Sequence, residues 1–132
     1  MTEVFVDTSG FYAALDRTDL DHARAAQAFR RAVSDDWHLV TTNYIVHEYM
    51  ALIQARLGWA AVDAWLDHLL PLCQVVWVDA SLHDLALARC RQARQRRLSL
   101  TDCCSIQVMR QQGIRQYLGN DEHFSAEGFV QA

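Results

Sequence analysis

The sequence contains no lysine, so all twelve of its positively charged side chains are arginines. A P-loop requires a lysine that reaches the nucleotide phosphates. Schiff-base chemistry requires a reactive amine, which only the N-terminus could supply here. Phospho-receiver domains, which are small α/β proteins with acids after a strand, also rely on a lysine. The absence of this residue type therefore argues against all three classes of protein.

Proline, glycine and long apolar runs are scarce as well. The chain has one proline and five glycines, and 52% of its 132 residues are hydrophobic, which is typical of a folded protein with a single domain over residues 1–132. No apolar stretch approaches the roughly 20 residues of a membrane helix. The N-terminus MTEVFVD lacks the basic and apolar regions of a secretory signal. We therefore expect a cytoplasmic protein without a membrane segment.

Cysteine is present but is not arranged for metal binding or redox chemistry. The four cysteines form no CxxC motif, which argues against a zinc site and against a thioredoxin-type site. We expect all four to be free thiols, as is usual in the cytosol.

Short β-branched and aromatic runs alternate with longer segments of helical periodicity. The pattern predicts strands at residues 4–6, 38–41, 74–78 and 115–118. It predicts helices at residues 10–15, 21–34, 44–57, 60–70, 82–96 and 100–112. Strands separated by helices require crossover connections, so we expect an α/β fold with a mainly parallel sheet. In such sheets, functional residues gather at the carboxyl ends of the strands.

Three carboxylates stand at positions where a function is conceivable. Asp7 directly follows the first predicted strand in VFVDTSGFYAAL, and Asp121 follows the last one in LGNDEHF. Both have structural interpretations, Asp7 as a helix N-cap and Asp121 as a turn residue. Glu48 lies in the helix NYIVHEYMALIQARL, too deep to cap it and at the edge of the apolar stripe. An exposed helical glutamate is common, so a structural interpretation holds for Glu48 too.

A fourth carboxylate, Asp102, lies in RRLSLTDCCSIQVM. Ser99 and Asp102 have the spacing of a capping box. Asp102 also shares a helix face with Ile106 and Met109, which indicates that its side chain points inward. An inward-facing carboxylate requires a partner or a metal, because an unpaired buried charge is very costly.

Taken together, the four acids favour a metal site. Acids at the carboxyl ends of strands, joined by one from a core helix, can converge on one pocket, where they repel each other. A hard divalent cation such as Mg²⁺ or Mn²⁺ relieves that repulsion and prefers oxygen ligands. The chain has 16 acidic residues and 12 arginines, so its net charge of −4 equals the charge of these four acids.

The segments VFVDTSGFYAAL, NYIVHEYMAL, LSLTDCCSIQVM and LGNDEHF resemble, in the same order, the successive motifs of the PIN domain. The resemblance runs from Val4 to about Phe129 and is closest to the single-domain VapC-type toxins of bacterial toxin–antitoxin pairs. It implies a three-layer α/β/α fold with a mainly parallel central sheet. It also implies a metal-dependent endoribonuclease, the toxin of a type II pair. The catalytic and metal-binding positions of the family fall on Asp7, Glu48, Asp102 and Asp121.

The resemblance further implies an RNA substrate, an antitoxin partner, a homodimer, and Mg²⁺ or Mn²⁺ as the cofactor. One or two such ions would orient a water, lower its pKa and stabilise charge on the phosphate. Glu48 or Asp121 could help to orient or deprotonate that water. One position departs from the family, because Gly119 stands where a threonine or serine usually precedes the last acid by two residues.

An arginine-rich segment, ARCRQARQRRLSL, directly precedes the motif that contains Asp102. Within it, Arg94, Arg96 and Arg97 are candidates for contacts with an RNA backbone or an acidic partner at the rim of the pocket. The alternative is a solvated helix end, where cations are favoured by the helix dipole.

Three further residues have non-catalytic interpretations. His123 lies near Asp121, but a lone histidine is expected to be structural or on the surface. Trp59 and Trp65 could serve an interface, but the core is the expected place for both.

Two alternatives compete with a ribonuclease. The first is a PIN-like domain that no longer cuts and acts as a binding or scaffold module, which the departure at Gly119 leaves open. The second is a phosphatase of the haloacid-dehalogenase type, which also carries an aspartate after its first strand. That family places a second acid two residues further on, where this sequence has Ser9.

Overall fold

The computed structural model describes residues 1–132 and contains one five-stranded sheet with the strand order β3-β2-β1-β4-β5. The strands are β1 (Glu3–Val6), β2 (His38–Thr42), β3 (Cys73–Val76), β4 (Gln116–Leu118) and β5 (Val130–Gln131). All four pairings are parallel, which confirms the predicted α/β fold. The central strand β1 is completely buried over Val4, Phe5 and Val6, as expected for a parallel sheet covered on both faces.

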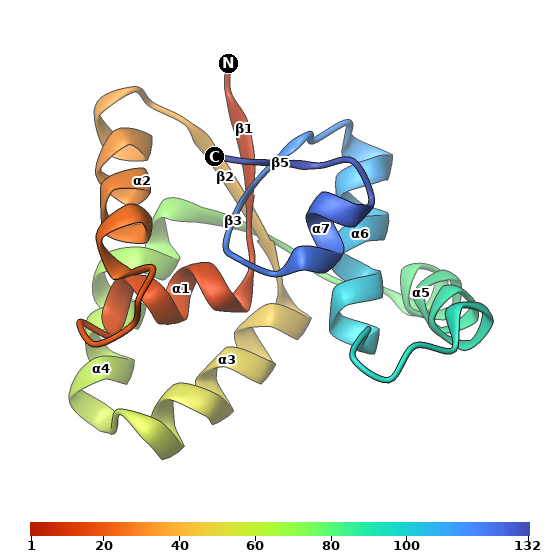
Figure 1. Cartoon of the computed structure of the whole chain (residues 1–132), viewed down its shortest axis with the longest axis horizontal. Coiled ribbons are helices and arrows are strands. Elements are labelled where there is room, and N and C mark those ends of the chain that lie inside the picture. The colour runs from red at the N-terminus through yellow and green to blue at the C-terminus, as the bar shows by residue number, and fades with distance from the viewer.

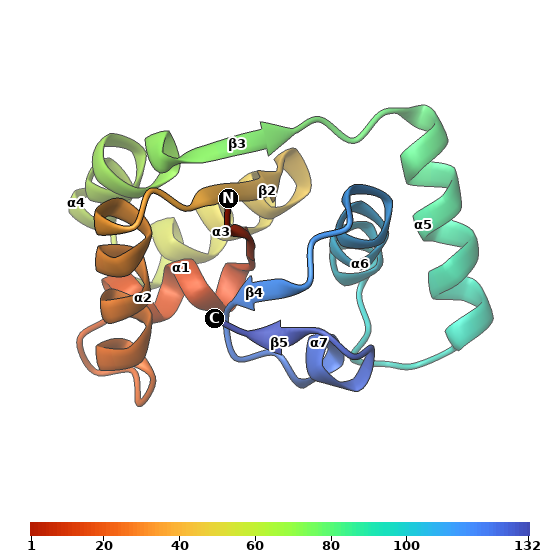
Figure 2. The ribbon, with the colours of Figure 1, turned by 90° about the horizontal axis from the view of Figure 1, so that it is seen from above.

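Helices cover both faces of the sheet and complete the three-layer α/β/α arrangement that was predicted. They are α1 (Thr8–Leu15), α2 (His22–Ser34), α3 (Asn43–Arg56), α4 (Trp59–Ala64), α5 (Ala80–Ala93), α6 (Leu100–Gln112) and α7 (Glu122–Ala126). A π-helical turn, η1 (Trp65–Leu69), and a 3-10 turn, η2 (Leu70–Leu72), follow α4. Figures 1 and 2 show α1, α2 and α4 on one side of the sheet and α5 and α6 on the other.

Two helices are shorter than the sequence pattern predicts. The segment predicted at 82–96 forms α5, which ends at Ala93 because Arg94 adopts a left-handed conformation with a φ of 52°. The segment predicted at 60–70 forms α4 and then widens into η1, and Pro71 lies in the 3-10 turn that follows. The sequence pattern does not predict α7 and β5, because segments this short show no clear period.

An aromatic cluster fills the core beside α1 and α3. Trp65 is completely buried, and its ring centroid lies 4.8 Å from that of Tyr49 and 5.8 Å from that of Phe11. The prediction of a core position for Trp65 is therefore confirmed. The same prediction for Trp59 is wrong, because this first residue of α4 is 56% exposed.

Two expectations from composition can be compared with the structure. All four cysteines are free, as predicted, and Cys103 and Cys104 are completely buried in α6. None of the helices has both the length and the apolar character that crossing a membrane requires.

The different burial of the two tryptophans leads to a stability prediction. Trp65→Ala removes a completely buried ring from a packed cluster, so we expect it to lower the free energy of unfolding by about 3–5 kcal/mol. Trp59→Ala changes an exposed side chain, and we expect a change within about 1 kcal/mol. Urea unfolding followed by circular dichroism measures both values, and equal losses in the two variants would contradict the packing.

Candidate active site

Asp7 lies at the carboxyl end of the central strand and also caps α1. Its Oδ2 accepts hydrogen bonds from the Ser9 hydroxyl at 2.8 Å and from the Ser9 backbone N–H at 3.4 Å. The Asp7 backbone N–H donates to the carbonyl of Leu118, at the end of the neighbouring β4, at 3.1 Å. The side chain is only 3% exposed. The sequence motif therefore produces an N-cap and a buried acid in the same residue.

Asp102 combines the two properties that the sequence analysis treated as alternatives. The capping box forms, because the Ser99 hydroxyl accepts from the Asp102 N–H at 3.1 Å and the Ser99 N–H donates to Asp102 Oδ2 at 3.0 Å. Asp102 is also buried, at 8% exposure, on the same helix as the completely buried Ile106 and Met109. The inward-facing prediction is confirmed.

Asp121 follows β4 and caps the short helix α7. Its Oδ1 accepts from the backbone N–H of His123 at 2.9 Å and lies 2.7 Å from Nδ1 of the His123 ring. The same Nδ1 lies 3.9 Å from Oδ2 of Asp102. His123 therefore stands between two of the predicted acids. The sequence interpretation of His123 as a structural or surface residue missed this, although its position two residues after a helix-capping aspartate was a usable signal.

Each of these three caps uses one carboxylate oxygen only. The hydrogen bonds reach Oδ2 of Asp7, Oδ2 of Asp102 and Oδ1 of Asp121, and the second oxygen of each side chain has no hydrogen-bond partner. One oxygen thus fixes the orientation of the carboxylate, and the other is left for a ligand. The structural and functional interpretations of these acids are compatible.

Glu48 joins the same site from α3. It is exposed, and its Oε1 accepts from the Thr8 hydroxyl at 3.2 Å. Asp7, Glu48, Asp102 and Asp121 all line one cavity of about 270 Å³. The lining also includes two charged residues that the sequence analysis missed, Asp19 and Arg56. Neither belongs to a motif with a recognisable spacing, so only the fold brings them to the acids.

The acidic cavity is electrostatically strained. Burial raises the pKa of Asp7 from 3.8 to about 7; the charges of Asp102 and Asp121 add to the rise, and the Ser9 hydroxyl opposes it. Burial also raises the pKa of Asp102, with a contribution from the charge of Asp121. A cation among these side chains would offset both the burial and the mutual repulsion.

The donor atoms of the cavity suit a divalent cation. One ligand atom from each of Asp102, Asp121 and His123 can be chosen so that all three lie within 4.8 Å of one another. Asp7 and Glu48 lie outside this group of three but line the same cavity. Carboxylate oxygens suit Mg²⁺ and Mn²⁺, and an imidazole nitrogen suits a transition metal better than Mg²⁺.

The departure from the family pattern at Gly119 has a steric explanation. A Cβ at this position would lie 2.7 Å from the Ser9 hydroxyl oxygen and 3.2 Å from Cβ of Asp7. The Ser9 hydroxyl donates to Asp7 and accepts from the backbone N–H of Asn120 at 3.0 Å. In this chain, the hydroxyl group beside the first and last acids therefore comes from Ser9.

The arginine-rich segment is divided between two roles. Arg89 lies on α5 and pairs with Glu127 at 2.7 Å, and Arg110 of α6 pairs with the other oxygen of Glu127. Arg94, Arg96 and Arg97 are exposed at the end of α5 and in the loop before α6, and they form no ion pair. None of these three lines the acidic cavity.

Comparison with known proteins identifies the family. The model of the PIN domain family matches residues 4–129, and the chain belongs to this family. It is similar to the 23S rRNA-specific endonuclease VapC20 of Mycobacterium tuberculosis, strains CDC 1551 / Oshkosh and H37Rv, with 36% identity over 97% of this chain and 96% of the relative. It is also similar to the crystal structure of M. tuberculosis VapC20, described as a sarcin-ricin loop cleaving toxin. The TM-score is 0.82, the identity is 34%, and 96% of each chain is covered.

The raised pKa of Asp7 predicts how stability depends on pH without a metal. Between pH 4 and pH 7 the folded chain holds a proton that the unfolded chain has lost, so the free energy of unfolding falls as the pH rises through this range. One pKa unit corresponds to about 1.4 kcal/mol, so we expect a fall of up to about 4 kcal/mol in EDTA. Urea unfolding at each pH measures it.

The matched control for this experiment is Asp7→Asn, which cannot ionise and should lose most of the fall. Identical pH profiles for the wild type and Asp7→Asn would contradict the raised pKa. Adding Mn²⁺ at pH 8 should stabilise the wild type more than Asp7→Asn.

Proposed function

We propose that this protein is a metal-dependent endoribonuclease that hydrolyses RNA phosphodiester bonds, and that it is the toxin of a type II toxin–antitoxin pair. The observation that carries the proposal is the convergence of Asp7, Glu48, Asp102 and Asp121 on one cavity. Membership of the PIN domain family and the similarity to VapC20 over nearly the whole chain support it.

The proposed cofactor is Mg²⁺ or Mn²⁺, held by Asp102 and Asp121 with support from Asp7. His123 offers a nitrogen next to the two ligands, which favours Mn²⁺ over Mg²⁺. When bound, such an ion supplies a water of lowered pKa and positive charge at the scissile phosphate.

The remaining residues of the cavity suit roles around the phosphate. Glu48 is the one exposed carboxylate of the four and is oriented by Thr8, so it is suited to accept the proton of the attacking water. Arg56 is the one arginine in the lining and is suited to bind a phosphate oxygen. Asp121 is less suited to the role of base, because it is one of the proposed ligands of the ion.

The proposed substrate is ribosomal RNA. The names of the similar proteins assign VapC20 to 23S rRNA and to its sarcin-ricin loop. An identity of 36% over 97% of this chain supports a hairpin of that loop as the first RNA to test. We further propose an antitoxin partner, a homodimer and action in the cytoplasm, as the family resemblance implies.

The alternatives from the sequence analysis are less well supported. A scaffold module that does not cut has no need of four acids around one cavity, and Gly119 no longer argues for it, because Ser9 supplies a hydroxyl in its place. The phosphatase alternative is excluded by membership of the PIN domain family.

Removing one carboxylate charge should strongly slow cleavage without unfolding the chain. We expect Asp7→Asn and Asp102→Asn each to slow Mn²⁺-dependent cleavage of the hairpin by about 100-fold or more, equivalent to about 2.7 kcal/mol of transition-state stabilisation. Circular dichroism should show an unchanged fold. Asp63→Asn is the matched control, because Asp63 is an exposed acid on α4 outside the cavity. Cleavage retained in both Asp7→Asn and Asp102→Asn would defeat the assignment.

The exposed arginines before α6 predict a salt-dependent contribution to RNA binding. Arg96→Glu combined with Arg97→Glu should weaken binding and lower the slope of log K against log salt by about 1.4, at about 0.7 per lost contact with a single strand. Arg30→Glu combined with Arg31→Glu, a pair of adjacent exposed arginines on α2, has the same charge change and should keep the wild-type slope. Filter binding at several salt concentrations measures both. An unchanged slope in the Arg96 and Arg97 variant would rule out this contact.

A further inference from the structure

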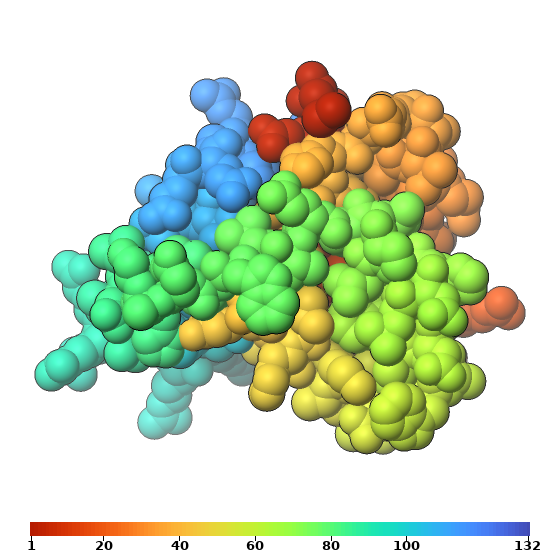
Figure 3. Space-filling model, turned by 180° about the vertical axis from the view of Figure 1, so that it is seen from behind, coloured from red at the N-terminus to blue at the C-terminus, as the bar shows by residue number.

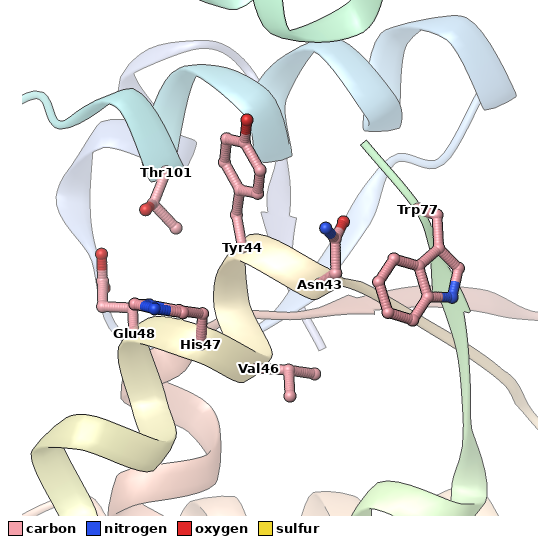
Figure 4. Close-up of a pocket in the computed structure, with 7 residues that line it drawn as sticks. All are labelled: Asn43, Tyr44, Val46, His47, Glu48, Trp77 and Thr101. Carbon is pink, nitrogen blue, oxygen red and sulfur yellow. The ribbon is translucent and has the colours of Figure 1, made fainter. Parts of the chain in front are cut away.

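A second, larger cavity adjoins the acidic site. Its volume is about 720 Å³, and it shares Glu48 with the acidic cavity. Thr101, which directly precedes Asp102 in the chain, lines the second cavity beside Glu48 (Figure 4). Glu48 therefore lines both cavities, so a substrate whose phosphate lies at the acids has the second cavity close beside it.

The wall of this cavity away from Glu48 is formed by an exposed tryptophan. Trp77 follows β3, is 75% exposed, and faces the start of α3 across the cavity (Figure 4). Figure 3 shows this side of the molecule, with the green segment around β3 next to the yellow start of α3. Tryptophan side chains are usually largely buried, so an indole this exposed is unusual. It offers a free aromatic face.

Further polar groups complete the cavity. Oδ1 of Asn43 accepts from the backbone N–H of Val78 at 2.6 Å, which leaves the amide N–H groups of Asn43 free to donate. His47 is exposed on the same turn of α3, and Thr101 adds a hydroxyl. No lysine or arginine lines the cavity. A site without a fixed positive charge is unsuited to a phosphate but suited to a nucleobase.

We propose that this cavity binds one unpaired nucleobase of the RNA substrate, stacked on Trp77, next to the phosphate that is cut. The inference rests on the proposed function. Sequence-specific proteins commonly read RNA by splaying single-stranded bases onto aromatic side chains and hydrogen-bonding their edges. Here Trp77 provides the stacking face, and Asn43, which lies beside it in Figure 4, provides amide N–H groups for the base edge. Because Glu48 lines both cavities, the occupant of the second cavity is expected to belong to the RNA whose phosphate lies at the acids. This favours a base over a partner helix.

The experiment uses a hairpin with the sarcin-ricin loop sequence in which 2-aminopurine replaces one loop base at a time. Binding is measured in the Asp102→Asn background, which does not cut under the proposed function. We expect quenching of the fluorescence at one position, and its loss when Trp77→Ala is added. Trp77→Phe should restore the quenching, because a smaller aromatic face remains. Trp59→Ala is the matched control and should leave the quenching unchanged.

Affinity and kinetics provide the second measurement. Trp77→Ala should weaken hairpin binding by roughly 5- to 160-fold, the range of one base–aromatic stack. In the otherwise wild-type chain it should raise KM by a similar factor and leave the single-turnover rate at saturating RNA close to the wild-type value. Sedimentation velocity of Trp77→Ala should match the wild type.

The possible failures are distinguishable. If the wild type cuts the hairpin and Trp77→Ala neither loses the quenching nor weakens binding, the base site is wrong and the proposed function stands. If Trp77→Ala changes the oligomeric state, the surface belongs to a contact between copies and the base site is wrong. If the wild type cuts no RNA but the Trp77-dependent quenching persists, the base site stands and the proposed function is wrong.

Discussion

The burial and mutual repulsion of carboxylates that share one cavity beside the end of the central strand are the constraint on which the rest of the structure depends. Each of the three aspartates is held in place by a hydrogen bond to a nearby residue, Asp7 by Ser9, Asp102 by Ser99 and Asp121 by His123. These hydrogen bonds involve one carboxylate oxygen of each aspartate and leave the second oxygen without a hydrogen-bond partner. Burial, together with the neighbouring charges of Asp102 and Asp121, raises the pKa of Asp7 to about 7, so its ionised form is disfavoured in the absence of a cation. A site whose ionised carboxylates are unfavourable without a cation binds the cation more tightly, because binding offsets the repulsion between these carboxylates.

The parallel sheet supplies the geometry that local capping alone cannot provide. β1 and β4 are neighbours and run in the same direction, so Asp7 and Asp121 leave the sheet at the same edge. The approach of α1 to β4 is so close that a Cβ on Gly10 would lie 2.3 Å from the carbonyl oxygen of Leu118. A Cβ on Gly119 would likewise lie too close to a neighbour, at 2.7 Å from the Ser9 hydroxyl oxygen. The two glycines allow the acids to meet, and the Ser9 hydroxyl fills the space that a side chain at 119 would need.

The sequence predicted the features that depend on local pattern and missed those that depend on the fold. Asp7, Asp102 and Asp121 were recognisable because each combines a strand end or a helix face with capping chemistry, and Glu48 because it lies at the edge of an apolar helix stripe. The parallel sheet follows from the alternation of strands and helices. Arg56 and Trp77 carry no local signal, since a helix end and a loop tryptophan have many possible surroundings. Trp59 was misplaced because hydrophobicity favours burial but does not say which tryptophan the core can hold. His123 lay within reach of sequence reasoning, since its partner Asp121 is two residues away.

The distribution of charge reconciles an acidic chain with an RNA substrate. Glu127, just after α7, forms ion pairs with Arg89 of α5 and Arg110 of α6. These ion pairs link α7 to α5 and α6. These ion pairs position Asp121 and His123 at the cost of two arginines that could otherwise attract RNA. The arginines at the end of α5 and in the loop before α6 stay unpaired, outside the acidic cavity. Positive charge is therefore exposed at the end of α5 and in the loop before α6, while the negative charge is concentrated where a divalent cation would reverse its effect on a phosphate.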